Sequence, residues 1–193
     1  ILQSKRLSKK WLLAFNGILD AYLGKVPTEF MYMGESHTPE SFAAFLNIEP
    51  DNYISFTSFT HHPFYESFIL EIPDNYSNGS FYNLPMEELT ALIDHAIENG
   101  FSVAWDGDVS EQGFSAREGI AIMPADPIRE DLFTMPGEEI EPSQELRQDQ
   151  FESYATTDDH LMHIVGKAVD QKGNNYYIIK NSWGKISPYE GYM

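Results

Sequence analysis

The feature that most constrains the fold lies in the last third of the chain, where two β-prone segments flank a turn. Residues 163–169 and 176–179 are rich in β-branched and aromatic side chains, and residues 170–175, Asp-Gln-Lys-Gly-Asn-Asn, favour a turn. The pattern predicts an antiparallel hairpin, which returns the chain to the edge it left. His160, before the first strand, and Asn181, after the second, should therefore lie close together.

An imidazole beside a side-chain amide is a chemically meaningful pair. A neutral imidazole can take a proton from a thiol, and an amide can hold the imidazole in one tautomer and orientation. The chain contains no cysteine, so it offers the base and its orienting amide without a matching nucleophile. The neighbouring hydroxyl of Ser182 is no replacement, because a serine ionises far less than a thiol near neutral pH.

Composition limits the classes of partner. With 30 acidic and 12 basic residues, the 193-residue chain has a formal charge of −18, which repels nucleic acid and anionic lipid surfaces. No apolar run approaches the roughly 20 residues that cross a bilayer. Hydrophobic residues make up 42% of the chain, which is enough for a globular core. We therefore expect one globular unit with no nucleic-acid partner and no membrane partner.

Periodicity and turn signals predict the elements before the hairpin. Helices are expected at residues 8–23, after the cap and proline at residues 38–39, and at 83–100. Short β segments are expected at 53–59, 68–72, 101–105 and 119–123. The acidic stretch 126–150 lacks a sustained apolar stripe and is predicted to be a surface loop.

The motifs, taken in order, resemble papain-type cysteine peptidases, and most closely the bleomycin hydrolase and bacterial aminopeptidase C branch. The resemblance rests on residues 156–160, 162–166 and 177–184, which end in Asn-Ser-Trp-Gly, and is extended by residues 101–106, Arg147-Gln148 and Phe151-Glu152. Together these segments span most of residues 83–184.

The resemblance implies an α+β fold, namely the C-terminal, β-rich half of a papain-like cysteine peptidase with extra helices. Residues 1–82 would form a helical and extended segment before the core. Residues 83–193 would form the right-hand subdomain, truncated before its last strand, and the whole chain would be a single unit. The family's nucleophilic cysteine and oxyanion-hole glutamine have no counterpart here, so a missing N-terminal half is an expected partner and this chain alone is expected to be inactive.

The resemblance also implies residue roles in peptide-bond hydrolysis through a thioester. His160 would be the general base and Asn181 would orient it. Trp183 would shield their hydrogen bond, and Asp159 would support the site. Two residues match positions that line a pocket for an apolar side chain of the peptide substrate: Ala104 and Leu161.

The resemblance implies no cofactor, a cytoplasmic location and association into a homo-oligomer. It leaves open a periplasmic or secreted location, because the N-terminus is absent, and leaves open exopeptidase versus endopeptidase action. The histidines at 61, 62, 160 and 163, with Asp158 and Asp159, could suggest a metal site. Neighbouring residues of an extended segment point to opposite faces, however, so no metal is expected.

A second class of function also stays open. A non-catalytic binding or interaction protein could keep the papain fold after losing its cysteine. A binding module would not need His160, Asn181 and Trp183 for chemistry. Their presence favours the truncated enzyme.

Overall fold

The computed structural model describes Ser8 and residues 10–193, and the chain divides into two compact units, Ile1–Tyr53 and Ile54–Met193. A single unit, subdivided after residue 82, is expected from the sequence. The boundary falls earlier because β3 (Phe56–Thr57) pairs in parallel with β5 (Ser80–Asn83), which ties the segment after Tyr53 to the second unit.

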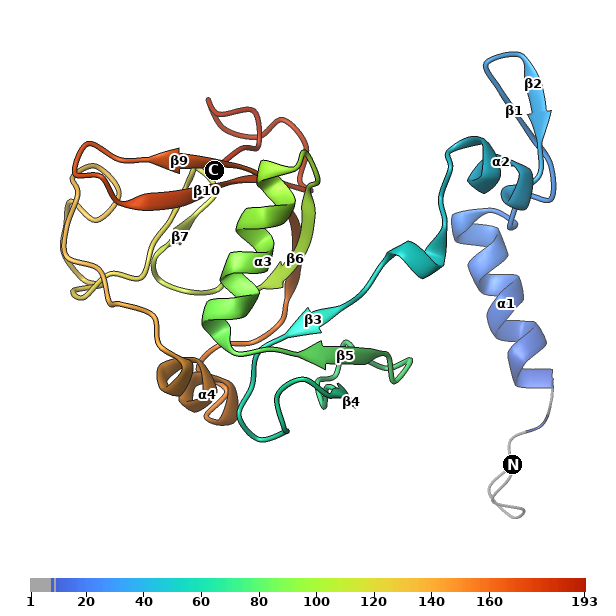
Figure 1. Ribbon diagram of the computed structural model, residues 1–193. Helices are drawn as coiled ribbons and strands as arrows, with labels where there is room; N and C mark the ends of the chain where they lie inside the picture. The colour runs from blue at the N-terminus through green and yellow to red at the C-terminus, as the bar shows by residue number, and fades with distance from the viewer. Residues whose placement is uncertain (1–7, 9) are drawn as a thin grey trace. The chain divides into compact units, whose positions relative to one another are not determined.

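In the described part of the first unit there are two α-helices and a small hairpin (Figure 1). The predicted N-terminal helix is present as α1 (Lys10–Leu23). β1 (Phe30–Tyr32) pairs antiparallel with β2 (Glu35–His37). The predicted cap is confirmed at α2 (Pro39–Phe45), where the Thr38 hydroxyl accepts a hydrogen bond from the Ser41 amide. Edge-to-face aromatic contacts join the hairpin to α2 through Phe30, Tyr32, His37, Phe42 and Phe45. A short 3₁₀ turn, η1 (Pro50–Asn52), ends the unit.

The second unit is built on a three-stranded antiparallel sheet in the order β10-β9-β6. β9 (His160–Val169) and β10 (Asn175–Asn181) form the predicted hairpin, and β6 (Val103–Gly107) lies on the other side of β9. The ladder continues beyond the apolar runs, so His160 and Asn181 are the end residues of their strands rather than their flanks.

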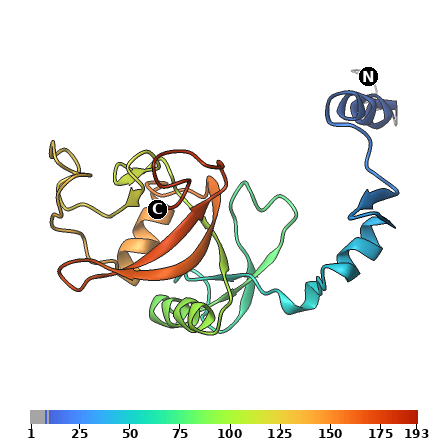
Figure 2. The ribbon, with the colours of Figure 1, turned by 90° about the horizontal axis from the view of Figure 1, so that it is seen from above.

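Helix α3 (Met86–Glu98) packs across this sheet (Figures 1 and 2). Its residues Ile93 and Ile97, on the predicted apolar face, contact a buried cluster of Met162, Ile164 and Ile179 from the hairpin. Full burial of such side chains stabilises the fold by about 1.5–3 kcal/mol each. Packing of the helix against the hairpin therefore holds β9 and β10, and the residues at their ends, in place.

The remaining elements surround this core. β4 (Ser67–Ile69) pairs antiparallel with β5, and β7 (Phe114–Ser115) with β8 (Ile120–Ala121). The predicted loop over 126–150 is wrong at its end, where α4 (Gln144–Glu152) begins at the Ser143 cap. Within the described part of the chain, no helix has the length and apolar character to cross a bilayer.

Candidate active site

The structure brings together the two residues at the centre of the predicted site. His160 Nε2 and Asn181 Oδ1 lie 2.8 Å apart. Each residue is fixed by backbone pairing, with His160 opposite Gly107 on β6 and the Asn181 amide donating to the Gly191 carbonyl at 2.9 Å. The contact thus follows from strand register rather than from a flexible loop.

The Asn181 amide determines which nitrogen of His160 carries hydrogen. Its Oδ1 has no hydrogen to donate, and it also accepts a longer hydrogen bond of 3.3 Å from the Trp183 backbone amide. His160 Nε2 must therefore be the donor, and in the neutral ring Nδ1 keeps its lone pair. Nδ1 is the atom that can take up a proton. The Ser182 hydroxyl lies 3.4 Å from the opposite nitrogen, Nε2, and so does not face the base.

The Asn181 side chain is 3% exposed, and its Nδ2 is buried without a hydrogen-bond partner among the residues that the structure describes. A buried amide donor without an acceptor costs about 1–3 kcal/mol. Such an unsatisfied donor marks a place where a polar group from elsewhere would be stabilised.

The Trp183 indole lies close to the His160 imidazole. The ring centroids of His160 and Trp183 are 4.6 Å apart with planes inclined by 38°, and Phe114 meets the far part of the indole at 6.3 Å, edge to face. An indole can exclude water from a neighbouring hydrogen bond without adding a titrating group. Its shielding role stays a prediction.

Aspartates fasten the segment that leads into His160. Asp159 Oδ1 accepts from the Val109 amide at 3.0 Å, and the Asp159 amide donates to Gly107 O at 3.3 Å. Asp108 makes a second set of such contacts. Its carboxylate accepts from the backbone amides of Ser110 and Thr157, both at 2.7 Å, and from the hydroxyls of both residues. Burial alone would raise the pKa of Asp108, but these hydrogen bonds hold the pKa below its usual range. Asp108 reaches Thr157 because β6, which precedes Asp108, pairs with β9, which follows Thr157.

Three further carboxylates gather beside the same segment. Asp74, Asp106 and Asp158 bring ligand oxygens within 4.8 Å of one another. Burial raises the pKa of Asp106, aided by the charge of Asp158; burial also raises the pKa of Asp158, aided by Asp74 and Asp159. One oxygen of Asp158 is buried with no hydrogen-bond partner in the described part of the chain. The potential here is negative, which favours a positive charge nearby.

The two predicted substrate-binding residues share one face of the sheet. Ala104 is opposite His163 and Leu161 is opposite Asp106 in the β6–β9 ladder, so both side chains lie on the face away from the α3 core. Leu161 is 59% exposed. An accessible apolar side chain next to His160 is compatible with contact to a substrate side chain, which stays a prediction.

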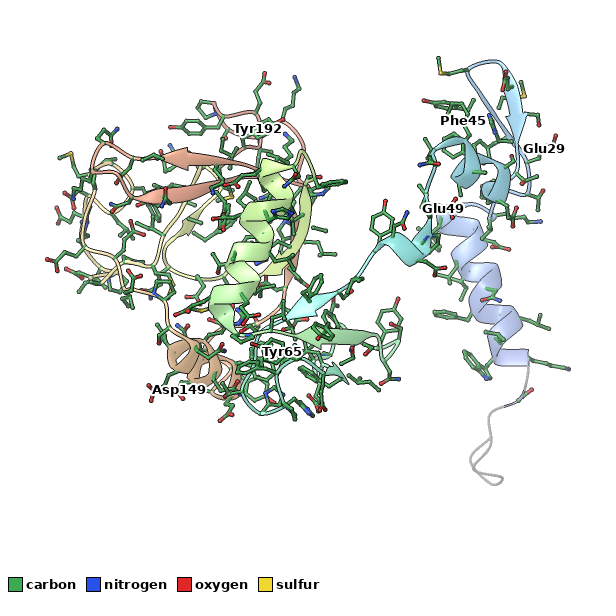
Figure 3. The ribbon with its side chains drawn as sticks, viewed as in Figure 1. Glu29, Phe45, Glu49, Tyr65, Asp149 and Tyr192 are labelled. Atoms are coloured by element: carbon green, nitrogen blue, oxygen red, sulfur yellow. The ribbon has the colours of Figure 1, made fainter. Side chains whose placement is uncertain are left out.

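Lys180, which precedes Asn181, contacts the last residues of the chain. Its ammonium lies 4.2 Å from the centre of the Tyr192 ring and donates to the Glu190 carbonyl at 2.6 Å. Tyr192 lies next to the hairpin of β9 and β10 (Figure 3). The amide and carbonyl of Ile179 also exchange hydrogen bonds with Met193. These contacts brace β10 on the side opposite β9.

Comparisons with known proteins agree with this architecture. A search of curated proteins finds no match to the chain. Among solved structures, PepW from Lactobacillus rhamnosis HN001 (DR20) matches with a TM-score of 0.68 and 22% identity, over 96% of this chain and 43% of that one. The chain thus spans less than half the length of the solved chain it matches, and at this identity the likeness shows the fold alone.

The sequence profile of the Peptidase C1-like family matches residues 28–193. That range includes both His160 and Asn181 and covers most of the chain. The α+β fold and the likeness to the C-terminal part of papain-like peptidases, both expected from the sequence, are confirmed. The protein belongs to the Peptidase C1-like family.

Proposed function

We propose that this chain carries the general base of a cysteine-type peptidase, and that the whole protein hydrolyses peptide bonds through a thioester. The observation that carries the proposal is the 2.8 Å hydrogen bond from His160 Nε2 to Asn181 Oδ1. It leaves Nδ1 as the basic nitrogen. The family match over residues 28–193 supports the same reaction class.

In this mechanism, His160 Nδ1 takes the proton from a cysteine thiol that lies outside this chain. The thiolate attacks the peptide carbonyl, and the imidazolium returns the proton to the leaving amine as the C–N bond breaks. Water then attacks the thioester and gives a proton to Nδ1. The C–S bond breaks, the carboxylic acid leaves, and the thiolate takes the proton back from Nδ1, which restores the thiol and the neutral imidazole. The Asn181 oxygen holds the ring while its charge alternates.

This mechanism requires two partners, a source of the thiol and a peptide substrate. We propose that an N-terminal part supplies the nucleophilic cysteine, because none of the 193 residues is cysteine. The substrate would be a peptide whose apolar side chain lies against Ala104 and Leu161. An aminopeptidase action is the finer proposal, since the motifs are most similar to the aminopeptidase C branch.

Turnover by the whole protein tests the proposal. The substrates are a reporter with a free N-terminal amine and the same reporter acetylated at that amine. We expect hydrolysis of the free form, a loss of several orders of magnitude for His160→Ala, and normal activity for the control His95→Gln on the exposed face of α3. Equal rates on both reporters would contradict the aminopeptidase proposal alone. Near-normal activity of His160→Ala would contradict the peptidase proposal itself and favour a non-catalytic binding protein.

A further inference from the structure

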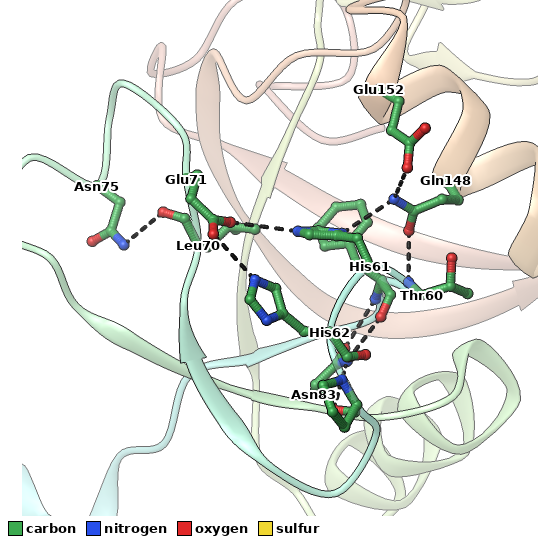
Figure 4. Close-up of polar contacts among 11 residues, drawn as sticks. Thr60, His61, His62, Leu70, Glu71, Asn75, Asn83, Gln148 and Glu152 are labelled. Atoms are coloured by element: carbon green, nitrogen blue, oxygen red, sulfur yellow. Dashed lines mark hydrogen bonds and ion pairs between the residues drawn. The ribbon is translucent and has the colours of Figure 1, made fainter.

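A second cluster of titratable side chains lies in the turn after β3. His61 Nε2 is 3.4 Å from one oxygen of Glu71, and His62 Nε2 is 3.1 Å from the other (Figure 4). The expectation that these neighbouring histidines point to opposite faces is wrong. Residues 60–62 form a turn rather than an extended segment, and the ring centroids of the two imidazoles are only 4.7 Å apart.

A buried asparagine, Asn83, forms hydrogen bonds with the backbone of the turn. Asn83 has no exposed surface. Its Oδ1 accepts from the Phe59 amide at 2.9 Å, and its Nδ2 donates to the carbonyls of Phe59, His62 and Pro63 at 2.8–3.1 Å (Figure 4). A side chain that satisfies this many backbone groups fixes the path of the turn. The backbone positions of His61 and His62 are therefore fixed.

Aromatic contacts also restrict the two rings. His61 stacks on Phe151 with centroids 5.4 Å apart and planes inclined by 17°. His62 stacks on Phe68 at 4.1 Å and 21°. Neither imidazole is free to rotate without losing its neighbour. The geometry around Glu71 is therefore preorganised, which lowers the entropy cost of binding a ligand.

The spacing of the polar atoms matches the coordination sphere of a small dication. A tetrahedral Zn²⁺ holds nitrogen and oxygen ligands at about 2.0–2.1 Å, which places adjacent ligand atoms about 3.3 Å apart. His61 Nε2 lies 3.4 Å from Glu71 Oε2 and His62 Nε2 lies 3.1 Å from Glu71 Oε1. One ligand atom from each of the three residues lies within 4.8 Å of the other two. Two imidazoles and a carboxylate are also the donor set that Zn²⁺ and its neighbours in the first transition row prefer.

We propose that His61, His62 and Glu71 form a binding site for a transition-metal dication of the Zn²⁺ type. Both histidines bind through Nε2, Glu71 binds through its carboxylate, and a fourth position faces solvent. The side chains are 26%, 34% and 60% exposed, so an ion can reach them from water. The formal charge of −18 favours cation binding in general.

Gln148 sets the strength of this site. Its Oε1 accepts from the Thr60 amide at 2.6 Å, and its Nε2 donates to Glu152 Oε1 at 2.8 Å, so the amide has one orientation. The same Nε2 lies 3.1 Å from His61 Nδ1. Without metal, Nδ1 must accept, and the proton of His61 sits on Nε2. Metal binding moves that proton to Nδ1, where Gln148 offers no acceptor, so Gln148 weakens binding.

Metal titration of the 193-residue chain tests the proposal directly. The chain is stripped with a chelator and titrated with Zn²⁺ by calorimetry and with Co²⁺ by visible absorption, which reports tetrahedral coordination. No cysteine competes for the ion, because the chain has none. We expect saturable binding of one ion per chain. Far-UV circular dichroism checks that each variant is folded.

Matched variants distinguish this site from adventitious binding. His62→Gln and Glu71→Gln should each lower the Zn²⁺ affinity by more than about 100-fold, beyond what the loss of an outer-shell partner costs. His95→Gln should leave it unchanged. Absence of a Zn²⁺ site, or equal effects of His62→Gln and His95→Gln, would overturn the proposal.

An exchange of two side chains tests the role of Gln148. The double variant Gln148→Glu/Glu152→Gln keeps the hydrogen bond between the two positions and places an acceptor beside His61 Nδ1. We expect Zn²⁺ affinity to rise by about tenfold or more, because a carboxylate behind a metal-bound imidazole strengthens the ligand. A fall in affinity in a folded double variant would contradict binding through His61 Nε2. None of these outcomes depends on peptidase activity.

Discussion

At the scale of single residues, Asn181 decides how His160 can act. Its side-chain oxygen accepts a hydrogen bond from His160 Nε2, which leaves Nδ1 with the lone pair. A group that orients a base affects turnover less than the base itself. A group that carries charge would change the pKa of the base as well.

Replacement of Asn181 by Asp in the whole protein should therefore change the pH profile of kcat/KM. The carboxylate still accepts from Nε2, and its negative charge stabilises the imidazolium. The basic limb of the profile should therefore move to higher pH. Asn181→Ala, which removes the acceptor, should lower kcat with no such shift. A basic limb that stays in place for Asn181→Asp in active enzyme would contradict the assigned contact.

Asp158 offers a residue-scale test of stability. Burial, with the charges of Asp74 and Asp159, raises the pKa of this carboxyl. Because the pKa is raised on folding, the carboxyl contributes most to the stability of the fold below its pKa in the unfolded chain, about 3.9. That contribution is lost as the pH rises through the pKa of Asp158 in the folded protein. Asp158→Asn should therefore raise the Tm at pH 7, and the gain should shrink toward pH 3.5. A Tm that falls at pH 7 and recovers in acid would contradict this reading.

At the scale of elements, two polar clamps position the strands and helices. Asp108 joins the end of β6 to the segment before β9. Gln144 of α4 accepts from the Met86 amide at 2.8 Å, at the start of α3, and from Ser58 Oγ at 3.0 Å. These contacts connect segments far apart in the sequence, and they set the geometry at which the apolar core closes.

The Asp108 clamp predicts a measurable loss of stability. Asp108→Ala removes four hydrogen bonds to a carboxylate, and after allowance for solvent screening it should lower the free energy of unfolding by about 1–2 kcal/mol. Because hydrogen bonds lower the folded pKa of Asp108, its contribution is present above the unfolded pKa and is lost as the pH falls through the folded pKa. Denaturant unfolding at pH 7 and pH 3 checks both points. The exposed Asp51→Ala is the control, and an equal loss in both variants would contradict the clamp.

The same contacts show what could be predicted from the sequence and what could not. The hairpin, α3 and the proximity of His160 to Asn181 follow from apolar periodicity and turn residues, which are local signals. Helix α4 was not predicted because it lacks an apolar stripe. It packs instead through hydrogen bonds from the side chains of three residues to residues 58–60, namely Gln144, Arg147 and Gln148. The proximity of His61 and His62 was not predicted because the turn that brings them together is hydrogen-bonded to Asn83, some twenty residues further along the chain.

At the scale of the whole molecule, the chain covers 43% of the solved PepW chain and contains no cysteine. Within it, His160 Nε2 lies 2.8 Å from Asn181 Oδ1, and the His160 and Trp183 ring centroids are 4.6 Å apart. The division into units at Tyr53 depends on which strands pair, and the sequence pattern alone did not reveal it. We propose that His160 of this chain activates a thiol that lies outside residues 1–193.

Denaturing mass spectrometry after affinity labelling tests that claim most directly. The whole protein is treated with a thiol-directed epoxide peptide at pH 6 to 7, next to His160→Ala and His95→Gln variants. We expect one label per active site on a cysteine outside residues 1–193, in the wild type and in His95→Gln, and far slower labelling in His160→Ala because the thiolate no longer forms. A protein without any labelled cysteine, or one labelled equally fast without His160, would contradict the assignment of this chain as the general-base part of a cysteine peptidase.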